Sequence, residues 1–199
     1  MMEKHLPYFS LLEGCSSSKC PVCFIVKKNS DRYLETLIYE GINDSGFRIN
    51  FKKNFGFCPV HTWQFQELKD SLATAILFKD LLSLEPESLL KKNKTCQICN
   101  LIKDTEDRIY AEMKLRLEDL EFKNLFVKSS GLCFYHYAKF ALKIKNKLPQ
   151  WFKDFHNKKI EELITETDRY IKTEDSTIDQ FSVSVVEKVK GLKNYIAIY

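Results

Sequence analysis

The sequence lacks the features that would place a protein in a membrane or in the secretory pathway. Its 199 residues contain no apolar run long enough to cross a bilayer. The segment from Met1 to Gly14 has no basic start followed by an apolar stretch and a small-residue cleavage site, so we expect no signal peptide. Basic and acidic residues nearly balance, 31 against 27, and the net charge is +4. This mild excess does not indicate a nucleic-acid binder or a polybasic ligand of membranes.

The motifs of common enzyme classes are also missing. There is no glycine-rich phosphate loop, no GxSxG nucleophile motif and no HExxH zinc motif. The composition, with 44% hydrophobic and 29% charged residues, is that of an ordinary globular protein and argues against disorder. The sequence therefore leaves enzymatic activity open and does not favour it.

What the sequence does have is seven cysteines, six of them in a regular arrangement. An odd number of cysteines without a secretory signal is a poor disulfide framework, and cytosolic cysteines more often bind metal or react. The six form two CxxC motifs and, with two histidines, two CxxH motifs: Cys20–Cys23, Cys58–His61, Cys96–Cys99 and Cys133–His136. The CxxC motifs begin 76 residues apart and the CxxH motifs 75 residues apart. One CxxC is a weak signal, whereas two sets in matching register predict metal binding.

The match between the two halves extends beyond the cysteines and indicates an internal repeat. The aligned pairs are Lys27 with Lys103, Asp31 with Asp107, Arg32 with Arg108, Gly56 with Gly131, and Phe65 with Phe140. We therefore expect a single compact domain over residues 1–199, with a first repeat at 14–90, a second at 91–149 and C-terminal helices at 150–199. Asp168-Arg169-Tyr170 and Gly191-Leu192 indicate either a degenerate third copy, without metal ligands, or chance similarity.

The spacing of apolar residues predicts an all-α fold, a helical bundle built from the duplicated unit. Turns are expected at Asn43–Gly46 and at Gly56. Helices are expected from Cys23 to Gly41, from Pro59 to about Leu84, from Cys96 to about Leu120, from Cys133 to Leu148, from Trp151 to Lys172 and from Ile178 to Lys190. Each motif thus lies at the N-terminus of a helix, where residues three apart face the same way and thiolates are favoured.

Two Cys3His sites follow from this arrangement, and we expect one in each repeat. Three thiolates and one imidazole suit a structural zinc ion, because four protein ligands leave no open position for a water nucleophile. An iron–sulfur cluster is the alternative. A c-type haem is excluded, since Phe24 and Asn100 stand where CxxCH needs histidine. The expected sites are Cys20, Cys23, Cys58 and His61 for one zinc ion, and Cys96, Cys99, Cys133 and His136 for the other.

The whole pattern resembles a family of uncharacterised prokaryotic proteins, a domain of unknown function with duplicated CxxC and CxxH motifs. The likeness covers most of the chain, from Tyr8 to the C-terminal helices, and departs at Gln97, where proline is more usual. It implies metal binding and a helical fold, and no activity. The residues that carry it are Cys20–Cys23, Asn43-Asp44, Gly56–Trp63, Cys96–Cys99 and Gly131–His136.

The remaining cysteine and histidines have no partner at metal-ligand spacing. Cys15 is either a reactive thiol, a spare ligand or an incidental loop residue, and we favour the last, because nothing in the sequence indicates the electropositive setting that reactivity needs. His5 and His156 are expected to be surface or packing residues.

Two charged features allow a functional and a structural interpretation. The segment Lys139–Lys159 interleaves seven lysines with aromatic residues and one acid, a pattern that can bind nucleic acid. A solvated helix face above buried aromatics is the interpretation we favour. The pairs Asp31-Arg32, Asp107-Arg108 and Asp168-Arg169 can bind an anion or another chain, but we expect them to bridge neighbouring helices.

The sequence as a whole predicts a cytoplasmic zinc protein that acts as a scaffold or protein-interaction module. A protein is the first expected partner, and nucleic acid, through Lys139–Lys159, is the second; no membrane partner is expected. The alternative is a redox- or metal-responsive protein, whose thiolates release zinc when they are oxidised.

Overall fold

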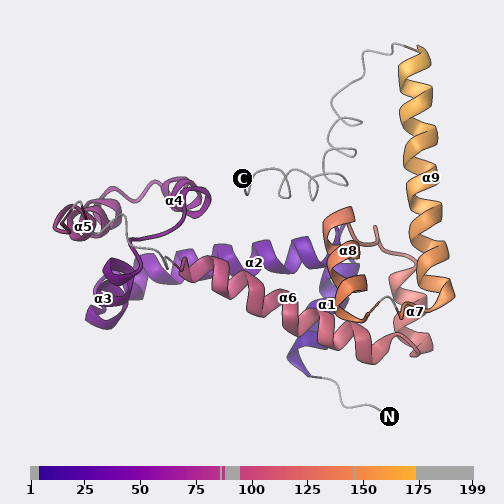
Figure 1. Ribbon diagram of the computed structural model, residues 1–199, viewed down its shortest axis with the longest axis horizontal. Coiled ribbons are helices and arrows are strands. Elements are labelled where there is room, and N and C mark those ends of the chain that lie inside the picture. The colour runs from indigo at the N-terminus through magenta and orange to yellow at the C-terminus, as the bar shows by residue number, and fades with distance from the viewer. Residues whose placement is uncertain (1–4, 86, 88–94, 146, 174–199) are drawn as a thin grey trace. The chain divides into compact units, whose positions relative to one another are not determined.

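The computed structural model describes residues 5–85, 87, 95–145 and 147–173, and all regular elements in these ranges are helical (Figure 1). The predicted all-α fold is confirmed. None of the described helices combines the length and apolarity that a membrane span requires. The helices are α1 (Leu6–Cys15), α2 (Pro21–Thr36), the π-helical turn η1 (Leu37–Gly41), α3 (Ser45–Lys53), α4 (Pro59–Gln66), α5 (Ser71–Leu82), α6 (Gln97–Arg116), α7 (Leu120–Phe126), α8 (Phe134–Lys143) and α9 (Gln150–Thr173).

The chain divides into two compact units, where the sequence analysis expects one domain. Unit 1 comprises residues 1–25 and 107–199, and unit 2 comprises residues 26–106. The boundaries fall inside α2 and α6 and not between the repeats, so each unit combines parts of both repeats. The expected helix at 178–190 and the Gly191-Leu192 pair lie outside the described residues.

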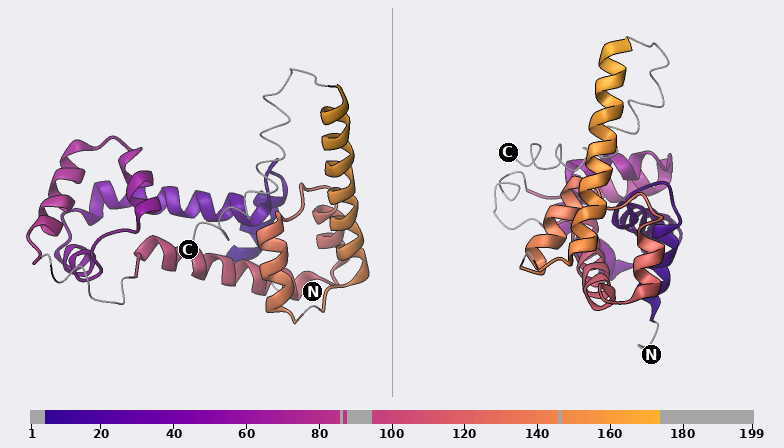
Figure 2. Two further views of the ribbon diagram at one scale, coloured as in Figure 1. Left: turned by 45° about the horizontal axis from the view of Figure 1, so that its top comes forward. Right: turned by 90° about the vertical axis from the view of Figure 1, so that its right-hand side faces the viewer.

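Unit 2 is built from three short helices around parts of α2 and α6 (Figure 2). Two hydrogen bonds show that α2 and α6 run antiparallel here. The Tyr33 hydroxyl of α2 donates to Gln97 Oε1 at the start of α6 at 2.7 Å, and Asn29, earlier in α2, donates to Thr105, later in α6, at 3.4 Å. Arg48 of α3 forms a two-bond ion pair with Asp80 of α5, at 2.6 and 2.7 Å. The core of this unit contains the buried side chains Leu34, Leu37, Ile42, Phe51, Phe65, Ala73, Leu77 and Ile98.

The long helix expected from Pro59 to Leu84 is in fact two helices, α4 and α5. Lys69 takes a left-handed conformation, with φ of 56°, which ends the first helix. The Asp70 carboxylate then accepts the Ala73 N–H at 2.8 Å and caps the second. The apolar period continues across the break, and periodicity alone therefore did not reveal it. The prediction of one continuous helix was wrong.

Four other helices differ from the expectation. The turn expected at Asn43–Gly46 leads directly into α3, which Asp44 caps by accepting the Phe47 N–H. The short helices α1 and α7 were not predicted either. In contrast, α8 ends at Lys143 and not at Leu148, because Lys145 has φ of 54°.

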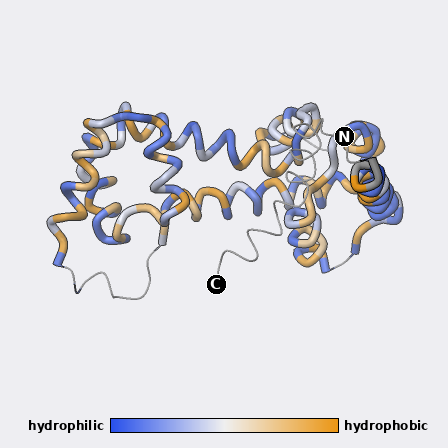
Figure 3. Tube along the Cα trace, turned by 90° about the horizontal axis from the view of Figure 1, so that it is seen from above, coloured by the Kyte–Doolittle hydropathy of each residue, from blue (hydrophilic) through white to orange (hydrophobic). Residues whose placement is uncertain are grey.

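The core of unit 1 is aromatic. Phe126 of α7 stacks on Phe152 of α9, with ring centroids 5.0 Å apart, and Phe152 also contacts Phe140 of α8 at 5.8 Å. All three rings are fully buried. In Figure 3, hydrophobic and hydrophilic stretches alternate along the described part of the chain, as expected where helices bury one side. Unit 1 thus has a sizeable hydrophobic core of its own.

A buried ion pair lies beside this core. Arg116 Nε donates to Glu112 Oε1 at 2.8 Å, and both side chains are less than a tenth exposed. The Arg116 guanidinium also stacks over the ring of Tyr8 at 4.7 Å and lies 3.6 Å from Asp119. This cluster connects α6 with α1 and with the cap of α7.

Replacing Arg116 by methionine is expected to destabilise unit 1 by about 3–5 kcal/mol, because Glu112 then stays buried without its cation. The double variant Arg116→Met/Glu112→Leu is expected to recover most of this loss, since both charges are gone. Urea unfolding followed by circular dichroism measures both effects. A double variant less stable than the single one would contradict the assignment.

Candidate metal centres

The four cysteine motifs share one local structure. The first cysteine of each motif directly precedes a helix, and its carbonyl accepts the N–H four residues on: Cys20 from Phe24, Cys58 from Thr62, Cys96 from Asn100 and Cys133 from Tyr137, all at 2.9–3.1 Å. Cys58 and Cys133 cap α4 and α8 with the same backbone conformation, φ/ψ of −67/163° and −68/164°. Both ligands of a motif therefore lie on the first turn of a helix, as predicted.

The structure brings the eight predicted ligands into two groups of three cysteines and one histidine. The ligand atoms within each group all lie within 4.8 Å of one another. Both groups have the composition and position at helix N-termini that the sequence predicts, and each can hold a metal ion. The unit 1 group is Cys20, Cys23, Cys133 and His136, and the unit 2 group is Cys58, His61, Cys96 and Cys99.

The expected division of these ligands between the repeats was wrong. Each group takes its CxxC motif from one repeat and its CxxH motif from the other, and neither of these two groups lies within a single repeat. The reason is that α2 begins in unit 1 and ends in unit 2, so the second half of the first repeat belongs to unit 2. The antiparallel α6 then returns the chain to unit 1.

The distances within both groups fit four-fold coordination of one ion. Metal–ligand distances of about 2.3 Å for sulfur and 2.0 Å for nitrogen in a tetrahedron place two sulfurs about 3.8 Å apart and a sulfur and a nitrogen about 3.5 Å apart. The Sγ–Sγ distances are 3.7 Å for Cys23–Cys133 and for Cys58–Cys99. The Sγ–Nδ1 distances to His136 and His61 lie between 3.1 and 3.5 Å.

Within each group, the ionisation of one thiol hinders the ionisation of another. Hydrogen bonds to Cys133 and Cys20, together with burial, hold the pKa of Cys23 far above its ordinary value, while bonds from Cys20 and Cys23 hold the pKa of Cys133 far below. In unit 2, burial and the neighbouring thiolates of Cys96 and Cys58 raise the pKa of Cys99. A divalent cation removes this conflict, because it allows all three sulfurs to be thiolates at once.

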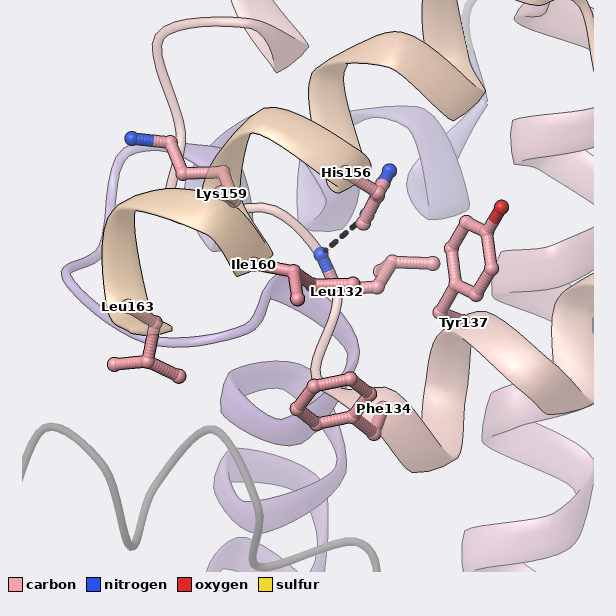
Figure 4. Close-up of a pocket in the computed structure, with 7 residues that line it drawn as sticks. All are labelled: Leu132, Phe134, Tyr137, His156, Lys159, Ile160 and Leu163. Carbon is pink, nitrogen blue, oxygen red and sulfur yellow. Dashed lines mark hydrogen bonds between the residues drawn. The ribbon is translucent and has the colours of Figure 1, made fainter. Parts of the chain in front are cut away.

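A glycine and a histidine hold the loop that carries Cys133. Gly131 has φ of 68°, and a Cβ atom there would lie 2.9 Å from the ring of Phe155. The next N–H, of Leu132, donates to His156 Nε2 at 2.9 Å (Figure 4). On the other side of the ring, His156 Nδ1 donates to the Phe152 carbonyl at 2.9 Å. His156 is therefore a neutral, buried acceptor that fixes the backbone beside a ligand.

His156, expected to be a surface or packing residue, is a packing residue, and its contact with the ligand loop was not predicted. Its ring is 4% exposed and lies 4.6 Å from the ring of Tyr137 and 4.5 Å from that of Phe152. The sequence contains no signal for this contact, because Leu132 and His156 are 24 residues apart and belong to different helical segments.

Replacing His156 by leucine is expected to destabilise unit 1 by about 1–3 kcal/mol, because the buried N–H of Leu132 loses its acceptor. Glutamine at this position keeps an acceptor and should cost less. Urea unfolding followed by the fluorescence of Trp151, which contacts Phe126 at 6.3 Å between centroids, measures unit 1. Equal losses for leucine and glutamine would show that packing, and not the hydrogen bond, is what His156 contributes.

The matching loop of unit 2 uses a different support. Gly56 has a positive φ of 82°, and its equivalent Gly131 has one of 68°. Gly56, however, packs against Phe51 and Leu81. The ligand motif of α6 is held by Gln97, which accepts the hydroxyl of Tyr33. Gln97 is the position where proline is more usual, and glutamine here provides a bond between α6 and α2 that proline cannot make.

Cys15 lies outside both groups. It is the last residue of α1 and is 5% exposed, so it is a core residue and not the loop residue that the sequence analysis favoured. Burial, together with the charge of nearby Cys20, raises the pKa of Cys15 to about 12. Its thiol is therefore protonated at neutral pH, which argues against a reactive thiol.

The charged features of the sequence have structural partners. Asp31 accepts from Gln64 of α4 at 3.0 Å, and Asp107, its equivalent, bonds to Lys143 of α8. Both aspartates thus bridge to a neighbouring helix, as predicted. In the segment Lys139–Lys159, Phe152 is fully buried and the indole of Trp151 donates to the Leu117 carbonyl at 3.2 Å, so these rings are part of the core.

Comparisons with known proteins give a match of part of the chain to a family, and no activity. Residues 84–182, which include the second CxxC and CxxH motifs, match the model of a family of unknown function (DUF6062). The chain is also 29% identical over 138 residues to an uncharacterized 23.9 kDa protein in the xynA 3′ region of Caldicellulosiruptor sp. (strain Rt8B.4), covering 63% of this chain and 67% of the relative. No solved structure matches the chain. The resemblance to an uncharacterised family, predicted from the duplicated motifs, is therefore confirmed, and residues 84–182 of the chain match a family whose function is unknown.

Proposed function

We propose that each Cys3His group binds one structural zinc ion. The supporting observation is the set of sulfur–sulfur and sulfur–nitrogen distances, which fit a single tetrahedral ion in both groups. An iron–sulfur cluster would place several iron and sulfide atoms among the ligands and spread them farther apart. Four protein ligands leave no position for a substrate or a water nucleophile, so the proposed role of the ions is to hold helix starts together.

Elemental analysis of protein purified without added metal tests this proposal. The expected result is about two zinc ions per chain and no visible absorption, as for closed Cys3His sites. Iron together with a brown chromophore would overturn the zinc assignment. Neither metal, with seven titratable thiols, would overturn metal binding itself.

We further propose that the protein is a cytoplasmic scaffold that binds another protein through α4. Val60 and Trp63 are each 72% exposed and lie three residues apart on one face of this helix. The helix carries no charged side chain, and its histidine, His61, is a buried member of the unit 2 group. An exposed tryptophan on an uncharged face supports a protein partner over nucleic acid, which needs basic residues.

The two ligands at the start of α4 connect this face to the proposed zinc ion. Cys58 caps the helix and His61 lies on its first turn, so coordination would fix the position of Val60 and Trp63. A reducing compartment such as the cytosol keeps the ligand thiols available for metal.

A pair of matched variants tests the α4 face. Trp63→Ala is expected to abolish binding of the protein partner that the wild-type chain retains from its own cell extract, without loss of zinc. Leu72→Ala, at an equally exposed leucine on α5, is the control and should retain the partner. Equal retention by both variants would overturn the assignment of α4.

A further inference from the structure

The two Cys3His groups have the same sulfur geometry but differ in exposure. One pair of sulfurs in each group lies 3.7 Å apart, Cys23–Cys133 in unit 1 and Cys58–Cys99 in unit 2. Cys133 is 2% exposed, whereas Cys99 is exposed and Cys58 is half-buried. A small solute therefore reaches both sulfurs of the unit 2 pair but is excluded from one sulfur of the unit 1 pair.

The difference in exposure has a structural cause. In unit 1, the loop before Cys133 is covered by His156 and Phe155 of α9. In unit 2, the equivalent loop packs at Gly56 against Phe51 and Leu81. On α6, Ile98 is fully buried in the core, whereas the next residue, Cys99, is exposed.

We propose that Cys58 and Cys99 are a site of oxidation by hydroperoxides, and that oxidation joins them in a disulfide. The proposal deepens the proposed zinc function, on which it rests. The disulfide removes two of the four ligands of the unit 2 group and leaves Cys96 and His61. The unit 1 group, in which Cys20, Cys133 and His136 are buried and only Cys23 is half-buried, keeps its four ligands under the same treatment.

The reaction balances with one hydroperoxide as the oxidant. The exposed Cys99 thiolate attacks a peroxide oxygen, so that a sulfur–oxygen bond forms, the oxygen–oxygen bond breaks, and the leaving oxygen takes a proton. The Cys58 thiolate then attacks the Cys99 sulfenic acid; the sulfur–sulfur bond forms and hydroxide leaves, taking a second proton. Two thiolates are oxidised by two electrons, and the peroxide is reduced to two molecules of water, or to water and an alcohol.

Oxidation of Cys58 and Cys99 would change the position of the α4 face. Cys58 is the cap of α4, and Val60 and Trp63 follow it on the same helix. A disulfide to Cys99 draws this cap toward α6 and ends the coordination that holds the first turn. Peroxide therefore regulates the α4 face and leaves unit 1 intact.

The test uses full-length protein whose zinc content is measured before hydrogen peroxide is added. The expected result is release of one of two zinc ions to a chromogenic chelator, at least about ten-fold faster than the second. Peptide mapping should then give a Cys58–Cys99 disulfide, with recovery of zinc binding after reduction. Release of both ions at one rate, retention of both, or a disulfide between other cysteines would overturn the proposal.

Two variants, together with the initial zinc content, distinguish a failure of the oxidation proposal from a failure of the proposed zinc binding. Cys99→His supplies a nitrogen ligand but no thiol, and it should abolish the disulfide and the fast release of zinc. Cys15→Ala removes the thiol outside both groups and should leave the response unchanged. Absence of zinc before peroxide is added would contradict the proposed function, whereas the mapped disulfide tests the oxidation site with or without zinc.

Discussion

Chelation of the metal is expected to unfold unit 2 and to leave the aromatic core of unit 1 assembled. A structural zinc site contributes about 10–16 kcal/mol of apparent binding free energy, as much as the whole stability of a typical domain. Helices α3, α4 and α5 have 9, 8 and 12 residues, lengths at which an isolated helix is marginal in water. Unit 1 has the 24-residue α9 and the packed rings of Phe126, Phe140 and Phe152.

Two probes distinguish the units. Far-UV circular dichroism reports the loss of helix, and the chain has only two tryptophans, Trp63 in unit 2 and Trp151 in unit 1. In a Trp63→Phe variant, fluorescence therefore reports on unit 1 alone. The expected result is a partial loss of helix with a retained Trp151 signal, reversed by zinc. Loss of the Trp151 signal in step with the helix would mean that unit 1 depends on metal equally, and an unchanged spectrum would mean that neither unit does.

The ligands were predictable from the sequence because their chemistry is tied to local spacing. A cysteine at a helix start and a cysteine or histidine three residues later place two donor atoms on the same turn. This arrangement requires no contact with residues outside that turn. The supports of these turns are long-range contacts. His156 reaches Leu132 from another helix and Tyr33 reaches Gln97 across 64 residues, so spacing along the chain does not indicate them.

The errors in the predicted helices have local causes. Asp44, Asp70 and Asp119 each cap a helix through their carboxylates, and each of these caps was a start signal in the sequence. The apolar period around Asp70 masked the break. In particular, the left-handed conformations of Lys69 and Lys145 occur at residues that do not favour them, and no sequence pattern predicts such positions.

The sequence could not show which CxxC motif pairs with which CxxH motif. The spacing of the motifs is the same whether they pair within a repeat or between repeats. Only the antiparallel course of α2 and α6 decides, and it assigns Cys20 to the group of Cys133 and not to that of Cys58. Double substitutions therefore distinguish the two arrangements by the number of zinc ions that remain. Serine removes the thiolate with little change in volume.

Cys20→Ser/Cys133→Ser is expected to lose one zinc ion and keep the other, since both substitutions fall in the unit 1 group. Cys20→Ser/Cys58→Ser is expected to lose both, because it takes one ligand from each group. Pairing within repeats predicts the reverse: two ions lost in the first variant and one in the second. Zinc content measured on both proteins decides between the arrangements, since each variant lacks the same number of thiols and differs only in where they lie.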